Sequence, residues 1–140
     1  MVRFFNKDIK FQLSHKLLLK KWIKLTAEKY GYATGDINVI LCNDPYILEI
    51  NKQFLSHDYF TDIITFDYSE ENVINGELYI SIDTVEANAR EYGEEFEVEL
   101  HRVIIHGILH LCGLDDHCEE DIKEMRDAEA SALELLGELN

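Results

Sequence analysis

Hydrophobic and polar positions follow two different periods along the chain, and each period predicts one kind of element. In residues 14–31, apolar side chains such as Leu18 and Trp22 recur every three or four positions, which is typical of a helix with one buried face. Ser14 is a suitable cap for the start of this helix, and Gly31 is suited to its end. The first long element is therefore predicted to be an amphipathic helix.

Short apolar runs predict strands on both sides of a second helix. Residues 2–5 are expected to form an edge strand, and residues 37–42 are a run of Val, Ile and Leu typical of a buried strand. Pro45 suits the first turn of a helix that continues to about residue 55, because an N–H at that position would have no partner within the helix. A polar and aromatic loop then leads into a strand at residues 63–68.

The next segment predicts another strand followed by a helix. The Asn75-Gly76 pair is typical of a turn, so a strand is expected at residues 78–82, next to the preceding strand. Asp83 with Glu86 three positions later matches a capping box for the following helix, which Gly93 would close.

Two further helices complete the pattern, one at about residues 95–112 and one from about residue 119 onward. The inner face of the last helix is expected to contain Ile122, Met125, Leu133 and Leu136. With a single proline and no repeats or linker-like stretch, residues 1–140 are expected to form one domain. The pattern predicts an α+β fold in which a small mixed four-stranded β-sheet is packed with about five helices.

The helix at residues 95–112 carries the strongest chemical signal. His106 and His110 are one turn apart on the same face, so both imidazoles can reach one metal ion. The surrounding residues are apolar nearly all round, and a bound metal would give the buried ring nitrogens a partner. Gly113 suits a left-handed helix end, after which the chain can bend back and bring Asp116 or His117 to the same ion.

Three protein ligands leave at least one metal position open, which is typical of a catalytic site. Water bound there is acidified and can hydrolyse an ester, an amide or a phosphodiester. Zinc peptidases with the H-E-x-x-H motif place a glutamate directly after the first histidine as general base, and here that position is Gly107. Peptidase chemistry is therefore disfavoured. The sequence also contains no phosphate-cradling glycine motif and no serine-hydrolase motif.

The overall charge argues against a protein that coats nucleic acid, because the formal net charge is −15. The distribution is uneven: residues 1–35 hold eight Lys or Arg against two Asp or Glu, a balance of +6 that leaves −21 for the rest. Lys16, Lys20 and Lys24 line one side of the first helix. These lysines are either a solvated helix face or a contact for RNA, and the sequence leaves both readings open.

Cysteine use and hydropathy predict a soluble, cytoplasmic protein without a membrane partner. The three cysteines include no C-x-x-C pair, which suits a reducing compartment. No apolar run approaches the length of a membrane span. Polar residues also begin too early in the chain for a signal peptide.

Three motifs occur in order from residue 51 onward. The first contains Asn51, Phe54, Asp58, Thr61, Asp62 and Phe66; the second contains Gly76, Glu77, Leu78, Ile80 and Ser81; the third contains His106, Gly107, Leu109, His110, Leu111 and Gly113. In this combination the chain resembles the YbeY family of bacterial metal-dependent endoribonucleases.

The resemblance implies a zincin-like helix that holds one zinc ion through His106, His110 and either Asp116 or His117, with the two helix histidines at the catalytic centre. It also implies that a metal-bound water hydrolyses single-stranded ribosomal RNA, rather than DNA, in late ribosomal RNA maturation and ribosome quality control. The implied partners are the small ribosomal subunit and its assembly factors. His57, Asp58 and Thr61 are the expected substrate-binding residues.

The chain departs from the family pattern at two positions. The family's third histidine comes six residues after the second, where this chain has Asp116, so the spacing favours Asp116 over His117 unless a one-residue bulge intervenes. Leu55 stands where the family has an arginine, and leucine cannot make a bidentate contact to a phosphate, although His57 can replace part of that charge. The departure at Leu55 motivates a second hypothesis, a metal-stabilised ribosome-assembly or RNA-binding factor with little turnover.

Overall fold

The computed structural model describes residues 1–55 and 61–140, and this part of the chain forms an α+β fold, as predicted. The elements follow in the order β1 (Val2–Asn6), α1 (Lys16–Lys29), β2 (Ala33–Cys42), α2 (Asp44–Leu55), β3 (Ile63–Asp67), β4 (Val73–Ser81), α3 (Ile82–Tyr92), α4 (Phe96–Leu111) and α5 (Glu119–Leu139). None of the helices within these ranges combines the length and apolar character needed to cross a lipid bilayer.

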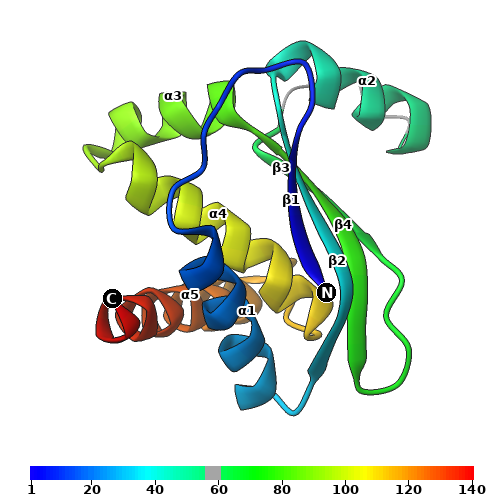
Figure 1. Cartoon of the computed structure of the whole chain (residues 1–140), viewed down its shortest axis with the longest axis vertical. Coiled ribbons are helices and arrows are strands. Elements are labelled where there is room, and N and C mark those ends of the chain that lie inside the picture. Colours follow the sequence, from blue (N-terminus) through cyan, green and yellow to red (C-terminus); the bar gives the residue numbers. More distant parts are fainter. Residues whose placement is uncertain (56–60) are drawn as a thin grey trace.

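The four strands form one mixed sheet in the order β1-β2-β4-β3 (Figure 1). β1 and β4 both run parallel to β2, whereas β3 runs antiparallel to β4. The predicted neighbours β3 and β4 do pair, with Ile63 opposite Ile80 and Asp67 opposite Gly76. β1 lies at one edge of the sheet, as expected, and β3 lies at the other.

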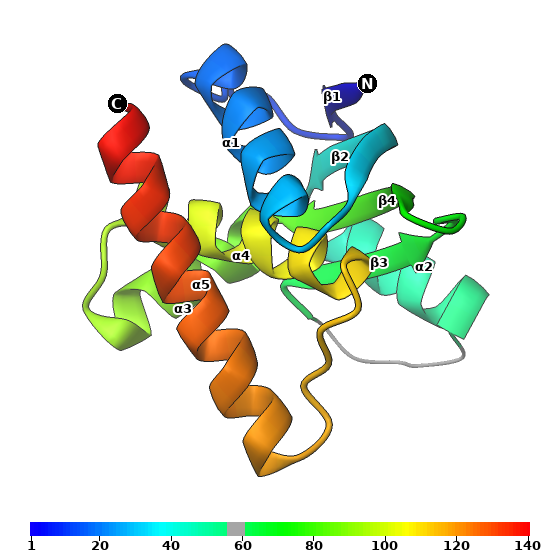
Figure 2. The ribbon, with the colours of Figure 1, turned by 90° about the horizontal axis from the view of Figure 1, so that it is seen from below.

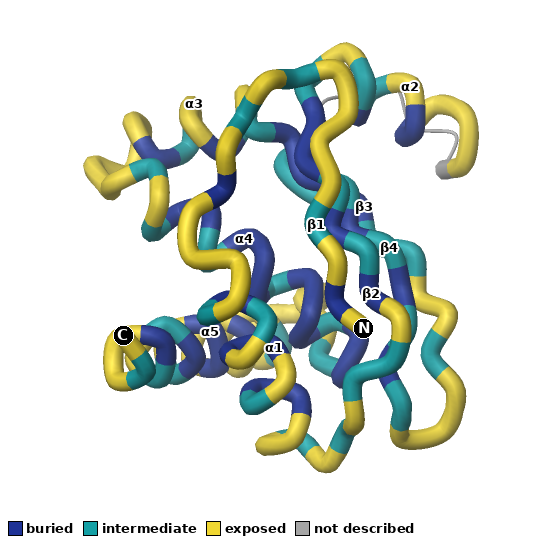
Figure 3. The backbone as a smooth tube through the Cα atoms, in the orientation of Figure 1, coloured by how far each residue is buried: buried dark blue, intermediate teal, exposed yellow. Residues whose placement is uncertain are grey.

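Helices cover the two faces of the sheet unequally (Figure 2). The main core lies between the sheet and α1, α4 and α5, where Trp22 is fully buried and its indole N–H donates to the Ala132 carbonyl at 2.7 Å. A smaller cluster on the α2 side contains Cys42, Ile47, Ile50 and Ile64. Buried positions are concentrated along α4 and the two central strands, β2 and β4 (Figure 3), so α4 is held on several sides.

Three local predictions about element ends were wrong. The helix cap at the start of α1 is His15, in a left-handed conformation, rather than Ser14. The Asn75-Gly76 pair lies inside β4 and forms no turn. The cap of α3 is Ser81, whose side chain accepts a hydrogen bond from the Thr84 N–H, so Asp83 does not form the expected capping box.

Two helix faces differ from the prediction by a small rotation. The buried face of α1 contains Leu19, Trp22, Ile23, Thr26 and Ala27, so Leu18 is only partly buried. On α5, Met125 and Leu136 are buried as predicted, but Ile122 is 44% exposed because it lies in the first turn, beyond the main core.

Candidate metal centre

The end of α4 places two histidines beside β3. A Cβ atom added to Gly107 would lie 2.8 Å from the Ile63 side chain and 2.9 Å from the Leu78 side chain, so this turn of the helix lies close against the sheet. Gly113 has the predicted left-handed conformation, with φ of 95°, and its N–H donates to the His110 carbonyl at 3.0 Å. The chain therefore turns back immediately after the helix that carries His106 and His110.

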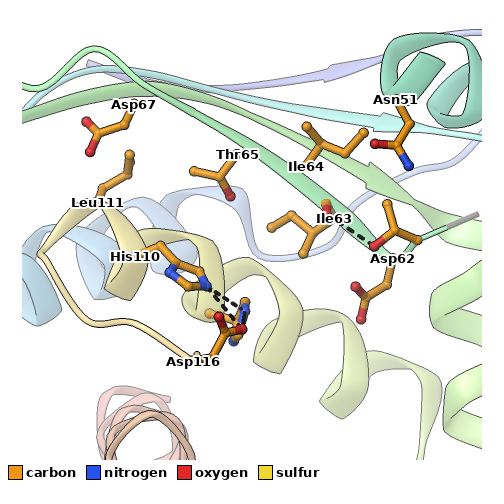
Figure 4. A pocket seen from close by; sticks show the side chains of 11 residues that line it. Asn51, Asp62, Ile63, Ile64, Thr65, Asp67, His110, Leu111 and Asp116 are labelled. Carbon is orange, nitrogen blue, oxygen red and sulfur yellow. Dashed lines mark hydrogen bonds and ion pairs between the residues drawn. The ribbon is translucent and has the colours of Figure 1, made fainter. Parts of the chain in front are cut away.

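This turn brings Asp116 to the two histidines (Figure 4). The Nε2 atoms of His106 and His110 are 3.0 Å apart, and Asp116 Oδ2 is 3.5 Å from each of them. Ligand atoms bound at 2.0–2.1 Å to a tetrahedral zinc ion lie about 3.4 Å from one another. The three side chains therefore fit around one ion of that size.

The structure does not bring His117 into this group. Its side chain is 81% exposed, and its Nε2 atom lies 3.8 Å from Asp115 Oδ1. Of the two alternatives for a third ligand, the geometry therefore favours Asp116.

A buried carboxylate fixes the orientation of His106 from behind. Glu129 on α5 is 2% exposed, and its Oε2 atom is 2.6 Å from His106 Nδ1. Its other oxygen accepts a hydrogen bond from Arg102 Nη1 at 3.1 Å, while Arg102 also donates to both oxygens of Glu99 at 2.8 and 2.9 Å. When neutral His106 donates Nδ1–H to Glu129, its Nε2 lone pair faces His110 and Asp116.

Charge compensation keeps this buried cluster ionised. Burial alone would raise the pKa of Glu129, but the hydrogen bond from His106 and the charge of Arg102 outweigh it and lower the pKa below its usual value. The pKa of Arg102 is raised, chiefly by its hydrogen bonds to Glu99. Glu129 and Arg102 therefore meet as opposite charges next to the candidate ligands.

Sequence reasoning missed both Glu129 and Arg102. Arg102 could have been noticed because it lies four residues before His106 and therefore on the same helix face. Glu129 gave a weaker signal: it is an acid among the apolar residues that form the inner face of α5, namely Met125, Ala128, Ala132 and Leu136.

A cleft of about 510 Å³ opens in front of the candidate ligands. Its walls include the predicted substrate-binding residue Thr61, together with Asp62 and Asp67 from the ends of β3. Burial raises the pKa of the Asp62 carboxyl, although Arg102 at 3.9 Å opposes the shift. His57, Asp58 and the side chain of Leu55 lie outside the described residues.

Comparison with known proteins gives one consistent result. A family model described as "Endoribonuclease YbeY" matches residues 2–137. A protein named "Endoribonuclease YbeY" from Parabacteroides distasonis is 49% identical over 137 residues, covering 98% of this chain and 96% of that protein. A protein of the same name from Porphyromonas gingivalis is 48% identical over 137 residues, and the match covers 98% of this chain and 91% of that protein. The solution structure of TM1509 from Thermotoga maritima matches with a TM-score of 0.69 and 36% identity, covering 97% of this chain and 89% of that one.

Proposed function

The chain belongs to the YbeY family of endoribonucleases, and from that premise we propose that it is a zinc-dependent, single-strand-specific endoribonuclease of late ribosomal RNA maturation and ribosome quality control. The observation that carries the proposal is the convergence of His106, His110 and Asp116 at the floor of a large cleft. This role implies a cytoplasmic protein that meets the small ribosomal subunit and its assembly factors.

The donor set supports zinc as the bound metal. Two imidazole nitrogens and one carboxylate oxygen are a common ligand set of catalytic zinc, and three protein ligands leave room for water or substrate. When bound there, zinc would supply Lewis acidity and an acidified water for attack on a phosphodiester.

The residues around the group support three separate tasks. Glu129 holds His106 in the orientation that presents its Nε2 atom. We propose that Asp62 takes up the proton released during attack, because a buried carboxylate with a raised pKa is a stronger base than an exposed one. The Thr61 hydroxyl, in the cleft wall, is suited to orient a phosphate oxygen, and His57 and Asp58 stay predicted substrate contacts.

The decisive experiment is metal restoration. We expect the chelated protein to lose cleavage of a single-stranded oligoribonucleotide and to regain it with Zn²⁺ or Mn²⁺, while duplex RNA and DNA of the same sequence stay intact. His110→Ala and Asp116→Ala should abolish cleavage and weaken zinc binding, whereas His117→Ala, a matched change one residue further on, should retain both.

Each alternative has its own outcome. Cleavage that survives in His110→Ala would point to a contaminating nuclease, and loss of zinc binding in His117→Ala would overturn the choice of Asp116. A wild-type protein that binds zinc and small-subunit particles without cleaving RNA would be a non-catalytic assembly factor instead.

A further inference from the structure

A second, smaller cavity of about 210 Å³ lies on the other side of the candidate ligands. It shares His106 and Asp116 with the main cleft, so the metal group stands between the two spaces. Its remaining walls come from α4 and α5 and consist of Arg102, Ile122, Met125, Arg126 and Glu129.

The two spaces differ in the cationic side chains that line them. Among the described residues that line the main cleft, Asp62, Asp67 and Asp116 are acidic and none is lysine or arginine. The smaller cavity is lined by two arginines, Arg102 and Arg126, together with the acids Asp116 and Glu129. A substrate made of linked phosphates needs cationic partners, and among the described residues that line either space the arginines belong to the smaller cavity.

Only one of these arginines is available to a ligand. Arg102 already donates to Glu99 and Glu129 and lies 3.9 Å from Asp62. Arg126 is exposed and forms no hydrogen bond or ion pair with any residue in the ranges that the structure describes. Since Ile122, Met125, Arg126 and Glu129 are spaced at i, i+3, i+4 and i+7, they share the face of α5 that borders the cavity.

We infer that this cavity is a phosphate subsite for the RNA strand, in which Arg126 binds a backbone phosphate next to the one that is cleaved. The inference rests on the proposed function and deepens it. The guanidinium can make two parallel hydrogen bonds to phosphate oxygens, and the half-exposed Ile122 offers an apolar surface for the adjoining sugar. Because both spaces meet at His106 and Asp116, one strand can run from the cleft past the metal group into the cavity.

The test compares Arg126→Gln with Lys123→Gln. Lys123 is exposed on the same helix and does not line the cavity, so its replacement removes the same charge elsewhere. The probe is a fluorescein-labelled single-stranded oligoribonucleotide, and its binding is measured by anisotropy over a range of salt concentrations. For Arg126→Gln we expect about tenfold weaker binding at low salt and a salt slope smaller by about 0.7, the value of one lost phosphate contact on a single strand.

Three further readouts separate a phosphate contact from a structural role. Lys123→Gln should leave the salt slope unchanged. Arg126→Lys should keep the slope but bind more weakly than wild type, because an ammonium cannot make the paired hydrogen bonds. Zinc affinity and thermal stability should be equal in all variants, and cleavage by Arg126→Gln should show a raised KM with a smaller change in kcat.

Equal salt slopes and equal KM values in Arg126→Gln and Lys123→Gln would overturn the subsite. If wild-type protein cleaves RNA in that case, only the subsite fails and the proposed function stands. If zinc-loaded wild-type protein neither binds nor cleaves the oligonucleotide, the proposed function fails and the subsite fails with it.

Discussion

At the scale of single residues, Glu129 links the packing of α5 to the candidate metal centre. Glu129→Gln keeps the size of the side chain but removes the charge that orients His106 and neutralises Arg102. We expect zinc affinity to fall about 10- to 100-fold, as is usual when a hydrogen-bond partner of a metal-binding histidine is changed. Competition with a chromogenic chelator measures this directly.

The control for this change is Glu134→Gln, an equally conservative substitution at an exposed position of the same helix. It should leave zinc affinity unchanged. The metal-free Glu129→Gln protein should also melt at a lower temperature, because the partly buried charge of Arg102 then has one carboxylate partner fewer. Wild-type zinc affinity in Glu129→Gln would show that His106 is oriented by other contacts.

Asp62 should affect activity and stability in opposite directions. Burial raises its pKa above the unfolded value, so the folded metal-free protein loses stability as pH rises from the unfolded pKa through the folded pKa. Asp62→Asn should remove this loss and raise the melting temperature at neutral pH, with the difference vanishing in acid. The same variant should cleave RNA about 10²- to 10⁴-fold more slowly, as expected for loss of a general base.

Thermal melts of metal-free protein across pH, together with single-turnover cleavage, test both parts. Asp67→Asn is the matched control because it changes another aspartate of the same cleft that is exposed. A lower melting temperature for Asp62→Asn at neutral pH would contradict the first expectation, and unchanged cleavage would contradict the second.

The site residues that could be predicted are those whose spacing is local. His106 and His110 lie on one helix turn, so their proximity follows from helix geometry alone. The choice between Asp116 and His117 depends on the path of the chain after Gly113, which only the folded turn decides. Glu129 lies 23 residues from His106, and no local pattern joins them.

At the scale of elements, long periodic segments were predictable and element ends were not. α2 and α4 match their predicted ranges closely because many positions contribute to each helical pattern. The Asn75-Gly76 pair was misleading because Gly76 lets the backbones of β3 and β4 approach closely and does not form a turn. Gly76 pairs with Asp67 across β3 and β4, and an added Cβ would lie 2.6 Å from the Phe66 carbonyl oxygen.

This role of Gly76 predicts that a larger residue at position 76 lowers the stability of the protein. In Gly76→Ala the new methyl group meets backbone, which cannot move aside as a flexible side chain can, so we expect a loss of about 1–3 kcal/mol in the free energy of unfolding. In Gly137→Ala, on α5, the methyl group meets nothing within 4 Å and should stabilise the helix by about 0.5–1 kcal/mol. Urea unfolding of both variants gives the two values, and a Gly76→Ala protein as stable as wild type would show that β3 can shift.

At the scale of the whole molecule, the sheet separates two apolar clusters of different size. The larger one, on the side of α1, α4 and α5, supports the helix that carries the candidate ligands. The smaller one, under α2, has four buried members among the residues that the structure describes, so it should open more readily than the main core. Each cluster contains a buried cysteine, Cys112 in the larger and Cys42 in the smaller.

These two thiols should report the opening of each cluster separately. Burial raises the pKa of Cys42 to about 12 and that of Cys112 to about 11, and since the thiolate is the reactive form, both should be inert in the folded protein. Cys118 is exposed, so Cys118→Ser removes the fast background reaction. With a thiol reagent under native conditions and peptide mapping of the product, Cys42 should be modified faster than Cys112, because opening of the smaller cluster costs less than global unfolding. Equal rates for both thiols would mean that the two faces of the sheet unfold as one cooperative unit.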